Sequence, residues 1–126
     1  MHSNHLFEYA VIRVVPKVER EEFLNVGIIL YCRDLDFLQT VYHLNENKLK
    51  AFYKEDCQEE LEKNLAAFSS IAAGENKTSP IARLDIASRF RWLTATRSTI
   101  LQTSKVHPGF CEEPKVMMEK LFVQYV

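Results

Sequence analysis

Glycine, proline and cysteine are scarce in this chain of 126 residues, which contains 3 glycines, 4 prolines and 3 cysteines. No two glycines lie close together, so the glycine-rich loops that bind phosphates are missing. The odd number of cysteines, without a CxxC pair, argues against a disulfide framework and favours a reduced, cytoplasmic protein. The histidines and cysteines show no ligand spacing, so we expect neither a structural metal nor a cofactor.

Long apolar runs are also missing from the sequence. None approaches the roughly 20 residues that a membrane-spanning helix needs, and the first residues contain no apolar secretory segment. An apolar fraction of 47% and a charged fraction of 26% are typical of a soluble globular protein that makes no contact with a membrane. One hydrophobic core suffices at this length, so residues 1–126 are predicted to form a single domain.

Two apolar runs near the N-terminus predict neighbouring β-strands joined by a charged turn. The first run, residues 7–15, is apolar on both faces, which predicts a central strand covered on both sides. The second run, residues 26–32, contains Gly27, which predicts a bulge or a close approach of the backbone. Residues 33–36 then form a hairpin connection to a third strand at residues 37–44.

Helical spacing is clearest over residues 57–73, where four apolar side chains share one face and Gly74 ends the helix. These side chains are Leu61, Leu65, Phe68 and Ala72. Further helices are predicted at residues 48–53, from Asp85 to about Leu93, and from Pro114 onward. Residues 98–103 predict a short strand and His107–Gly109 a turn. The fold class is therefore α+β, an antiparallel sheet with helices packed on it.

Eight polar residues are candidate contacts with a ligand or a partner: Arg13, Arg91, Arg97, Ser98, Thr99, Gln102, Thr103 and His107. Arg13 interrupts an apolar strand, and a buried guanidinium without an acceptor is costly. Two interpretations of Arg13 remain open. It forms an ion pair with Glu8 or with the charged turn, or it binds an anion at the sheet surface.

The segment 97–107 contains the densest group of polar side chains, which suits the binding of a phosphate or a carboxylate. An edge strand with a polar outer face explains the same pattern. Residues 81–110 carry five basic residues against Asp85 alone, a net charge of +4. Nucleic-acid or nucleotide binding through residues 83–107 is therefore one hypothesis, with phosphate contacts and aromatic stacking.

Catalytic chemistry is not indicated by any group of residues. His107 and Cys111 are separated by a proline and a glycine, which disfavours a helical pair of nucleophile and base. Paired glutamates are adjacent in sequence and are expected to point apart. We therefore predict no catalytic residue, and an enzyme is the least favoured class.

Several sequence runs occur in an order that resembles one bacterial family. They are YAVIRVVP at residues 9–16, NVGIIL at 25–30, FRWL at 90–93 and RSTILQT at 97–103. Together they resemble the domain of unknown function 3037 (DUF3037), a family without an established activity. Some relatives are encoded beside kinases resembling the toxin HipA, which implies a HipA-like kinase as partner. We expect a non-enzymatic binding or accessory module in the bacterial cytoplasm, with nucleic-acid binding as the alternative.

Overall fold

The computed structural model describes residues 4–16, 22–52, 58–75, 79–95 and 99–126. As predicted, the fold is α+β, with a five-stranded antiparallel sheet and helices packed on it. The strands are β1 (His5–Val14), β2 (Leu24–Cys32), β3 (Phe37–Tyr42), β4 (Leu101–Thr103) and β5 (His107–Cys111). The helices are α1 (Glu46–Phe52), α2 (Gln58–Ala73), the 3-10 helix η2 (Ile81–Arg83), α3 (Ile86–Leu93) and α4 (Pro114–Tyr125). Most of the predicted charged turn, residues 17–21, lies outside the described residues.

β1 lies at the centre of the sheet, as its apolar faces predicted. The strand order is β3-β2-β1-β4, and β5 also pairs with β1. The tight turn at residues 33–36 joins β2 to β3, with Asp36 in the left-handed region at φ 51°. β3 is an edge strand that ends at Tyr42, two residues earlier than predicted.

Gly27 lies beside a β-bulge and against β3, so both predictions for this glycine are confirmed. The pairing between β1 and β2 passes from Ile12–Gly27 to Arg13–Asn25, which leaves Val26 as the extra residue. A Cβ atom on Gly27 would lie 2.5 Å from the Val41 carbonyl oxygen. Only glycine lets the backbones of β2 and β3 approach so closely at this position.

β4 and β5 both pair with the edge of β1 that lies opposite β2, at successive positions along that strand. β4 pairs with residues 12–14 of β1, and β5 pairs with residues 5–9. The register shifts by one residue between the two strands, and Ser104 lies at the shift. Its backbone N–H donates to the Val11 carbonyl at 2.8 Å, and its hydroxyl accepts the Val11 N–H at 2.8 Å. The hydroxyl of Ser104 thus takes the place of a backbone carbonyl in the ladder.

The prediction of a turn at His107–Gly109 is wrong, because these residues begin β5. Proline is tolerated on an edge strand when its nitrogen faces away from the neighbouring strand. Pro108 meets that condition opposite Glu8. Gly109 lies opposite Phe7, and a Cβ atom there would lie 2.6 Å from Cζ of the phenyl ring. The glycine is therefore required by the Phe7 ring rather than by a turn.

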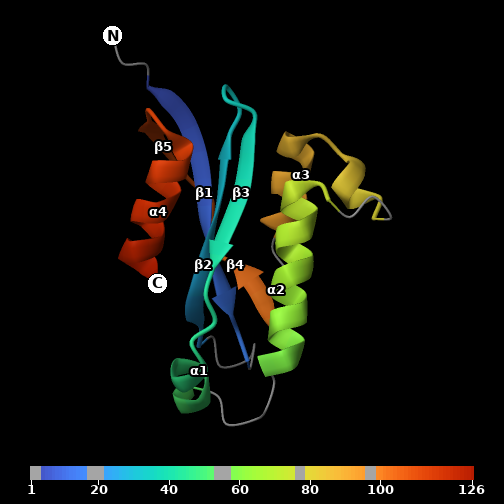
Figure 1. The fold of residues 1–126 in the computed structure, drawn as a ribbon, viewed down its shortest axis with the longest axis vertical. Helices are drawn as coiled ribbons and strands as arrows, with labels where there is room; N and C mark the ends of the chain where they lie inside the picture. Colours follow the sequence, from blue (N-terminus) through green and yellow to red (C-terminus); the bar gives the residue numbers. More distant parts are fainter. Residues whose placement is uncertain (1–3, 17–21, 53–57, 76–78, 96–98) are drawn as a thin grey trace.

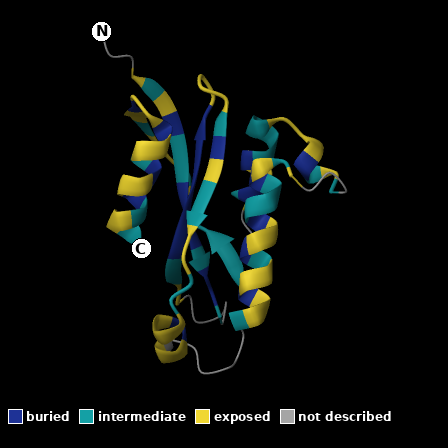
Figure 2. Cartoon of the chain, viewed as in Figure 1, coloured by how far each residue is buried: buried dark blue, intermediate teal, exposed yellow. Residues whose placement is uncertain are grey.

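Helices cover both faces of the sheet, as Figure 1 shows. α4 lies on one face, and α2 and α3 lie on the other. The outward sides of α2 and α4 are exposed, while the sides that face the sheet are buried (Figure 2). The sheet is therefore the middle layer of three, which accounts for the apolar character of both faces of β1.

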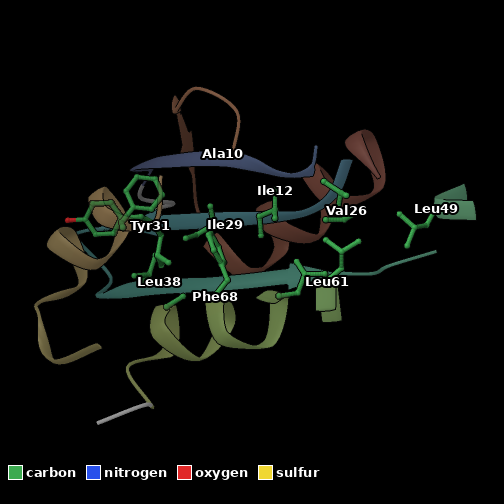
Figure 3. Close-up of a cluster of buried hydrophobic side chains, with 14 residues drawn as sticks. Ala10, Ile12, Val26, Ile29, Tyr31, Leu38, Leu49, Leu61 and Phe68 are labelled. Atoms are coloured by element: carbon green, nitrogen blue, oxygen red, sulfur yellow. The ribbon is translucent and has the colours of Figure 1, made fainter. Parts of the chain in front are cut away.

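The larger core cluster lies between the sheet and the helices α2 and α3 (Figure 3). The predicted stripe of α2 is confirmed, since Leu61, Leu65, Phe68 and Ala72 are all buried there. Phe90 of α3 is fully buried, with its ring centroid 5.2 Å from that of Tyr31. The smaller cluster lies under α4 and includes Phe7, Val11, Ile28, Leu30, Met118 and Leu121.

The end of α2 and the start of α4 follow the predicted local signals, whereas α1 begins at Glu46, two residues before its predicted start. Asn45 Oδ1 accepts the backbone N–H of Lys48 at 3.1 Å at the start of α1. Gly74 follows α2 with φ 71°, the left-handed conformation that ends helices. Pro114 occupies the first turn of α4, where a missing N–H costs nothing.

Truncating Phe68, whose exposed fraction is 8%, is expected to destabilise the fold by about 3–5 kcal/mol through lost burial and a residual cavity. The measurement is the free energy of unfolding of Phe68→Ala in urea. Phe110→Ala is the control, because Phe110 is 68% exposed and its loss is expected to change stability by about 0.5 kcal/mol or less. Equal losses in both variants would contradict the position of the core.

Gly109→Ala is expected to destabilise the fold by about 1–3 kcal/mol, because the added methyl group overlaps the buried Phe7 ring. Replacing Phe7 with leucine makes room for the methyl group. Gly109→Ala is therefore expected to lower the free energy of unfolding less in the Phe7→Leu variant than in the unaltered chain. A double-mutant cycle in urea measures this coupling, and strictly additive losses would refute the contact.

Candidate functional site

The candidate residues from the sequence do not converge on one surface. Arg13 lies at the end of β1, Arg91 on α3 and His107 at the start of β5. Thr99, Gln102 and Thr103 lie in and just before β4. Arg97 and Ser98 lie outside the described residues. Arg13 lies opposite Gln102 in the sheet, so it is a neighbour of the residues of β4, whereas Arg91 and His107 lie at two other positions.

Arg91 is held in an ion pair. Its guanidinium donates to both carboxylate oxygens of Glu8, at 2.7 and 3.3 Å. The contact ties α3 to β1 across 83 positions of sequence. Exposed pairs of this kind are worth about 0–1 kcal/mol, so the bond orients Arg91 more than it stabilises the fold. Because both terminal nitrogens of the guanidinium donate to Glu8, Arg91 is poorly placed to bind another anion.

Arg13 packs on an aromatic ring. Its guanidinium carbon lies 3.9 Å from the centroid of the Phe23 ring, a cation–π contact. Nε of Arg13 is buried without a hydrogen-bond partner, and burial lowers the pKa of the guanidinium. The predicted ion pair with Glu8 is wrong, because Glu8 binds Arg91. The alternative partners at residues 17–21 lie outside the described residues.

His107 belongs to a group of aromatic rings beside the end of α4. It lies opposite Tyr9 in the sheet, with ring centroids 5.5 Å apart. The hydroxyls of Tyr9 and Tyr125 are 3.1 Å apart, and Asn25 Nδ2 donates to the Tyr125 carbonyl at 3.2 Å. Burial, followed by the bond to Tyr125, raises the pKa of Tyr9 from 10.0 to about 12. These contacts fasten the C-terminal turn of α4 to β1 and β2.

His107 and Cys111 do not form a catalytic pair. They lie at opposite ends of β5, about 13 Å apart at the usual rise of an extended strand. That distance is far beyond the hydrogen-bond reach that a thiol and its base require. Burial, together with the nearby Cys32, raises the pKa of Cys111, which disfavours the reactive thiolate.

A hollow of about 270 Å³ lies between α2, the end of α3 and β4, and we call it the β4 groove. Its lining is mainly apolar, with amide and hydroxyl groups at its margin. The lining residues are Asn64, Ala67, Phe68, Ile71, Trp92, Leu93, Ala95, Thr99, Ile100, Leu101, Gln102 and Thr103. Three of the sequence-predicted candidates, Thr99, Gln102 and Thr103, therefore do belong to one site.

Local sequence explains how α2 forms one wall of the β4 groove. Asn64, Ala67 and Ile71 lie at helical spacing, so they share the side of α2 that faces β4. Ser69 is on the other flank, where its hydroxyl accepts a hydrogen bond from Thr40 of β3 at 2.8 Å. The small side chain of Ala67 leaves the middle of the groove open.

Short hydrogen bonds fix the opposite wall. Thr99 Oγ1 donates to the Leu101 carbonyl at 2.7 Å, and Gln102 Nε2 donates to the Thr99 carbonyl at 2.8 Å. Thr103 Oγ1 reaches the Thr94 carbonyl at 3.5 Å, which links β4 to the end of α3. The polar side chains of the segment that we considered for anion binding thus largely bind their own backbone.

A second hollow, of about 480 Å³, lies beside the hairpin between β2 and β3. Its charged lining mixes both signs, with Arg33 and Arg91 against Glu8, Asp36 and Asp85. The pair between Arg91 and Glu8 occupies part of this lining. Because neither sign predominates, the hollow does not favour an anionic or a cationic ligand.

Sequence reasoning missed the α2 wall of the β4 groove. We assigned the buried stripe correctly but overlooked the adjacent stripe of Asn64, Ala67 and Ile71. An alanine and an isoleucine beside a fully buried stripe widen the apolar face of α2, and that wider apolar face was the available signal.

Within the described ranges, no helix is long and apolar enough to span a membrane. The same ranges contain no cluster of three potential metal ligands.

Comparison with known proteins identifies a family. A family model with the description "Protein of unknown function (DUF3037)" matches residues 9–126. No curated protein and no solved structure matches the chain.

Stability is expected to fall as the pH rises from 10 towards 12, because in this range the folded chain keeps the Tyr9 proton and the unfolded chain loses it. Tyr9→Phe removes this group, so the variant is expected to lose less stability over that range than the unaltered chain. Urea unfolding at pH 9 and pH 11 measures the difference. Tyr42→Phe, at an exposed tyrosine of β3, is the matched control. An identical loss in Tyr9→Phe and the unaltered chain would disprove the partly buried hydroxyl pair.

Proposed function

The chain belongs to the DUF3037 family of proteins of unknown function, and from this premise we propose that it is a non-enzymatic protein-binding module. The β4 groove is its contact surface. The observation that carries this proposal is an apolar groove beside a sheet edge that no other described strand covers. Natural proteins usually cover or charge such an edge, because it readily pairs with another chain.

The composition of the β4 groove supports a protein partner. Phe68, Ile71 and Leu93 supply apolar walls, and Trp92 at the margin is 39% exposed. Aromatic residues are enriched where proteins contact each other. At about 270 Å³ the groove is smaller than the roughly 300–1,000 Å³ typical of small-molecule pockets. It suits a few side chains of a partner better than a cofactor.

A HipA-like kinase is the partner that the family resemblance suggests, and the bacterial cytoplasm is the corresponding location. Both belong to this proposal. An accessory role is consistent with the separation of His107 and Cys111, which lie at opposite ends of β5.

Nucleic-acid binding through residues 83–107 is the less favoured function. Arg89 donates to the carbonyls of Leu84 and Ala72, at 2.6 and 3.4 Å, and Arg91 is paired with Glu8. These two arginines are two of the five basic residues of the segment, and they already donate to oxygen atoms of the protein. Phosphate contacts require guanidinium groups that face the solvent.

Ala67→Arg tests the proposal, because a long charged side chain at this exposed position fills the β4 groove without disturbing the core. Ala66→Arg is the matched control. It makes the same change at the neighbouring exposed position of α2, outside the groove lining. Equal melting temperatures of the two variants would establish that both are folded.

The measurement is the set of proteins that the chain captures from a bacterial lysate, identified by mass spectrometry. Ala66→Arg is expected to capture the same proteins as the unaltered chain, and Ala67→Arg is expected not to capture them. Undiminished capture by Ala67→Arg would contradict binding through the groove. Fluorescence anisotropy with single-stranded DNA tests the alternative function. Sub-micromolar binding at physiological salt that falls steeply as salt is raised would favour nucleic acid instead.

A further inference from the structure

We propose that the β4 groove binds an extended peptide segment of the partner, which adds a strand to the outer edge of β4 and carries basic residues. The inference rests on the proposed function and specifies the conformation and charge of the bound segment. Three observations carry it: the direction of the backbone groups of β4, the interruption of the edge at β5, and the charge of α2.

The backbone of β4 presents hydrogen-bonding groups to the outside. Ser104 N–H donates to the Val11 carbonyl, and Val15 N–H donates to the Ile100 carbonyl, so Ser104 and Ile100 face β1. Backbone direction alternates along a strand, so Leu101 and Thr103 face away from β1. The Leu101 carbonyl already accepts the Thr99 hydroxyl. Within the described ranges, the N–H groups of Leu101 and Thr103 and the Thr103 carbonyl take part in no other hydrogen bond, so they are available to an added strand.

β5 continues the same edge but is a poorer template. The register shift at Ser104 reverses the alternation, so Pro108 and Phe110 are the residues of β5 that face outward. Pro108 has no N–H to donate. An added strand therefore finds two outward donors within the three residues of β4 and only one within the five residues of β5. Strand addition is favoured next to the groove and disfavoured beyond it.

The side chains of an added strand fit the β4 groove. Alternate residues of a strand point to the same face, so every second side chain would face α2. Ala67, Ile71 and Trp92 offer these side chains apolar contacts. Main-chain bonds that supply affinity and a pocket for alternate side chains are the combination used by domains that bind peptides by strand addition.

Charge complementarity with α2 predicts the charge of the bound segment. Residues 58–75 carry Glu59, Glu60, Glu62 and Glu75 against Lys63 alone, four acidic groups and one basic group, for a net charge of -3. Lys63 lies 3.6 Å from Glu59, so that pair is neutralised. Glu60 precedes Asn64 by one turn on the side of α2 that faces the groove. A segment with lysine or arginine beside its apolar residues therefore matches this wall.

The test selects phage-displayed random nonapeptides on the complete chain, with the Ala67→Arg chain for counter-selection. Enriched peptides are expected to have aliphatic residues at alternate positions, an excess of lysine and arginine, and no central proline. In amide exchange measured by NMR, a synthetic enriched peptide is expected to slow the exchange of the Leu101 and Thr103 N–H groups at least about tenfold.

Charge variants test the electrostatic part of the proposal. Glu60→Lys is expected to weaken binding of the same peptide about three- to tenfold. Glu62→Lys makes the same change at an exposed position away from the groove lining and is expected to leave affinity within about twofold. Equal effects of the two variants, or enrichment of acidic peptides, would refute the proposal that the bound segment is basic.

The outcomes separate this inference from the function on which it rests. Peptides that bind the unaltered chain but not Ala67→Arg, yet leave exchange at Leu101 and Thr103 unchanged, overturn strand addition while the groove remains a protein-binding surface. Selection of peptides whose apolar residues have helical spacing also overturns strand addition while the groove remains a protein-binding surface. Failure to enrich any peptide over the Ala67→Arg chain overturns the inference. Undiminished capture of proteins by Ala67→Arg overturns the proposed function itself.

Discussion

The continuity of the sheet on one side of β1 depends on the hydrogen bonds of Ser104. Two short strands with different registers meet at this residue, and a mismatch of one residue would ordinarily leave the Val11 N–H unpaired inside the protein. A buried donor without a partner costs about 1–3 kcal/mol. The Ser104 hydroxyl accepts that N–H and donates to the Lys105 carbonyl at 2.9 Å. Ser104 is also the one buried polar residue among the described residues.

The shift that Ser104 accommodates determines what the edge of the sheet can do. Because the register changes by one residue, β4 and β5 direct opposite sets of backbone groups to the outside. β4 presents donors beside an apolar groove, whereas β5 presents a proline. The same edge therefore has one segment suited to pairing and one protected from it, which limits uncontrolled pairing between chains. An open segment and a protected segment of the same edge thus arise from one local irregularity.

Sequence reasoning succeeded where the signal is local. The apolar faces of β1, the role of Gly27, the buried stripe of α2 and the proline of α4 each depend on neighbouring residues or on a simple periodicity. It failed where a side chain finds a distant partner. Ser104 meets Val11 across 93 positions, and Arg91 meets Glu8 across 83. The proline and glycine of β5 resembled a turn in the sequence. The features that explain them, the outer edge of the sheet for Pro108 and the ring of Phe7 for Gly109, form only when the chain folds. The β4 groove joins three elements, so its two walls are visible in the sequence but their meeting is not.

The central position of β1 has a consequence for synthesis of the protein. β1 is complete at Val14, but β5, which pairs with it, is complete only at Cys111, 97 residues later. At about 5–20 residues per second, a ribosome needs roughly 5–20 s to make the intervening chain. During that interval the N-terminal half of the central strand lacks its native neighbour on one side. The nascent chain therefore completes the pairing of β1 only after Cys111 has been made, and chaperones that hold exposed strands have that time in which to act.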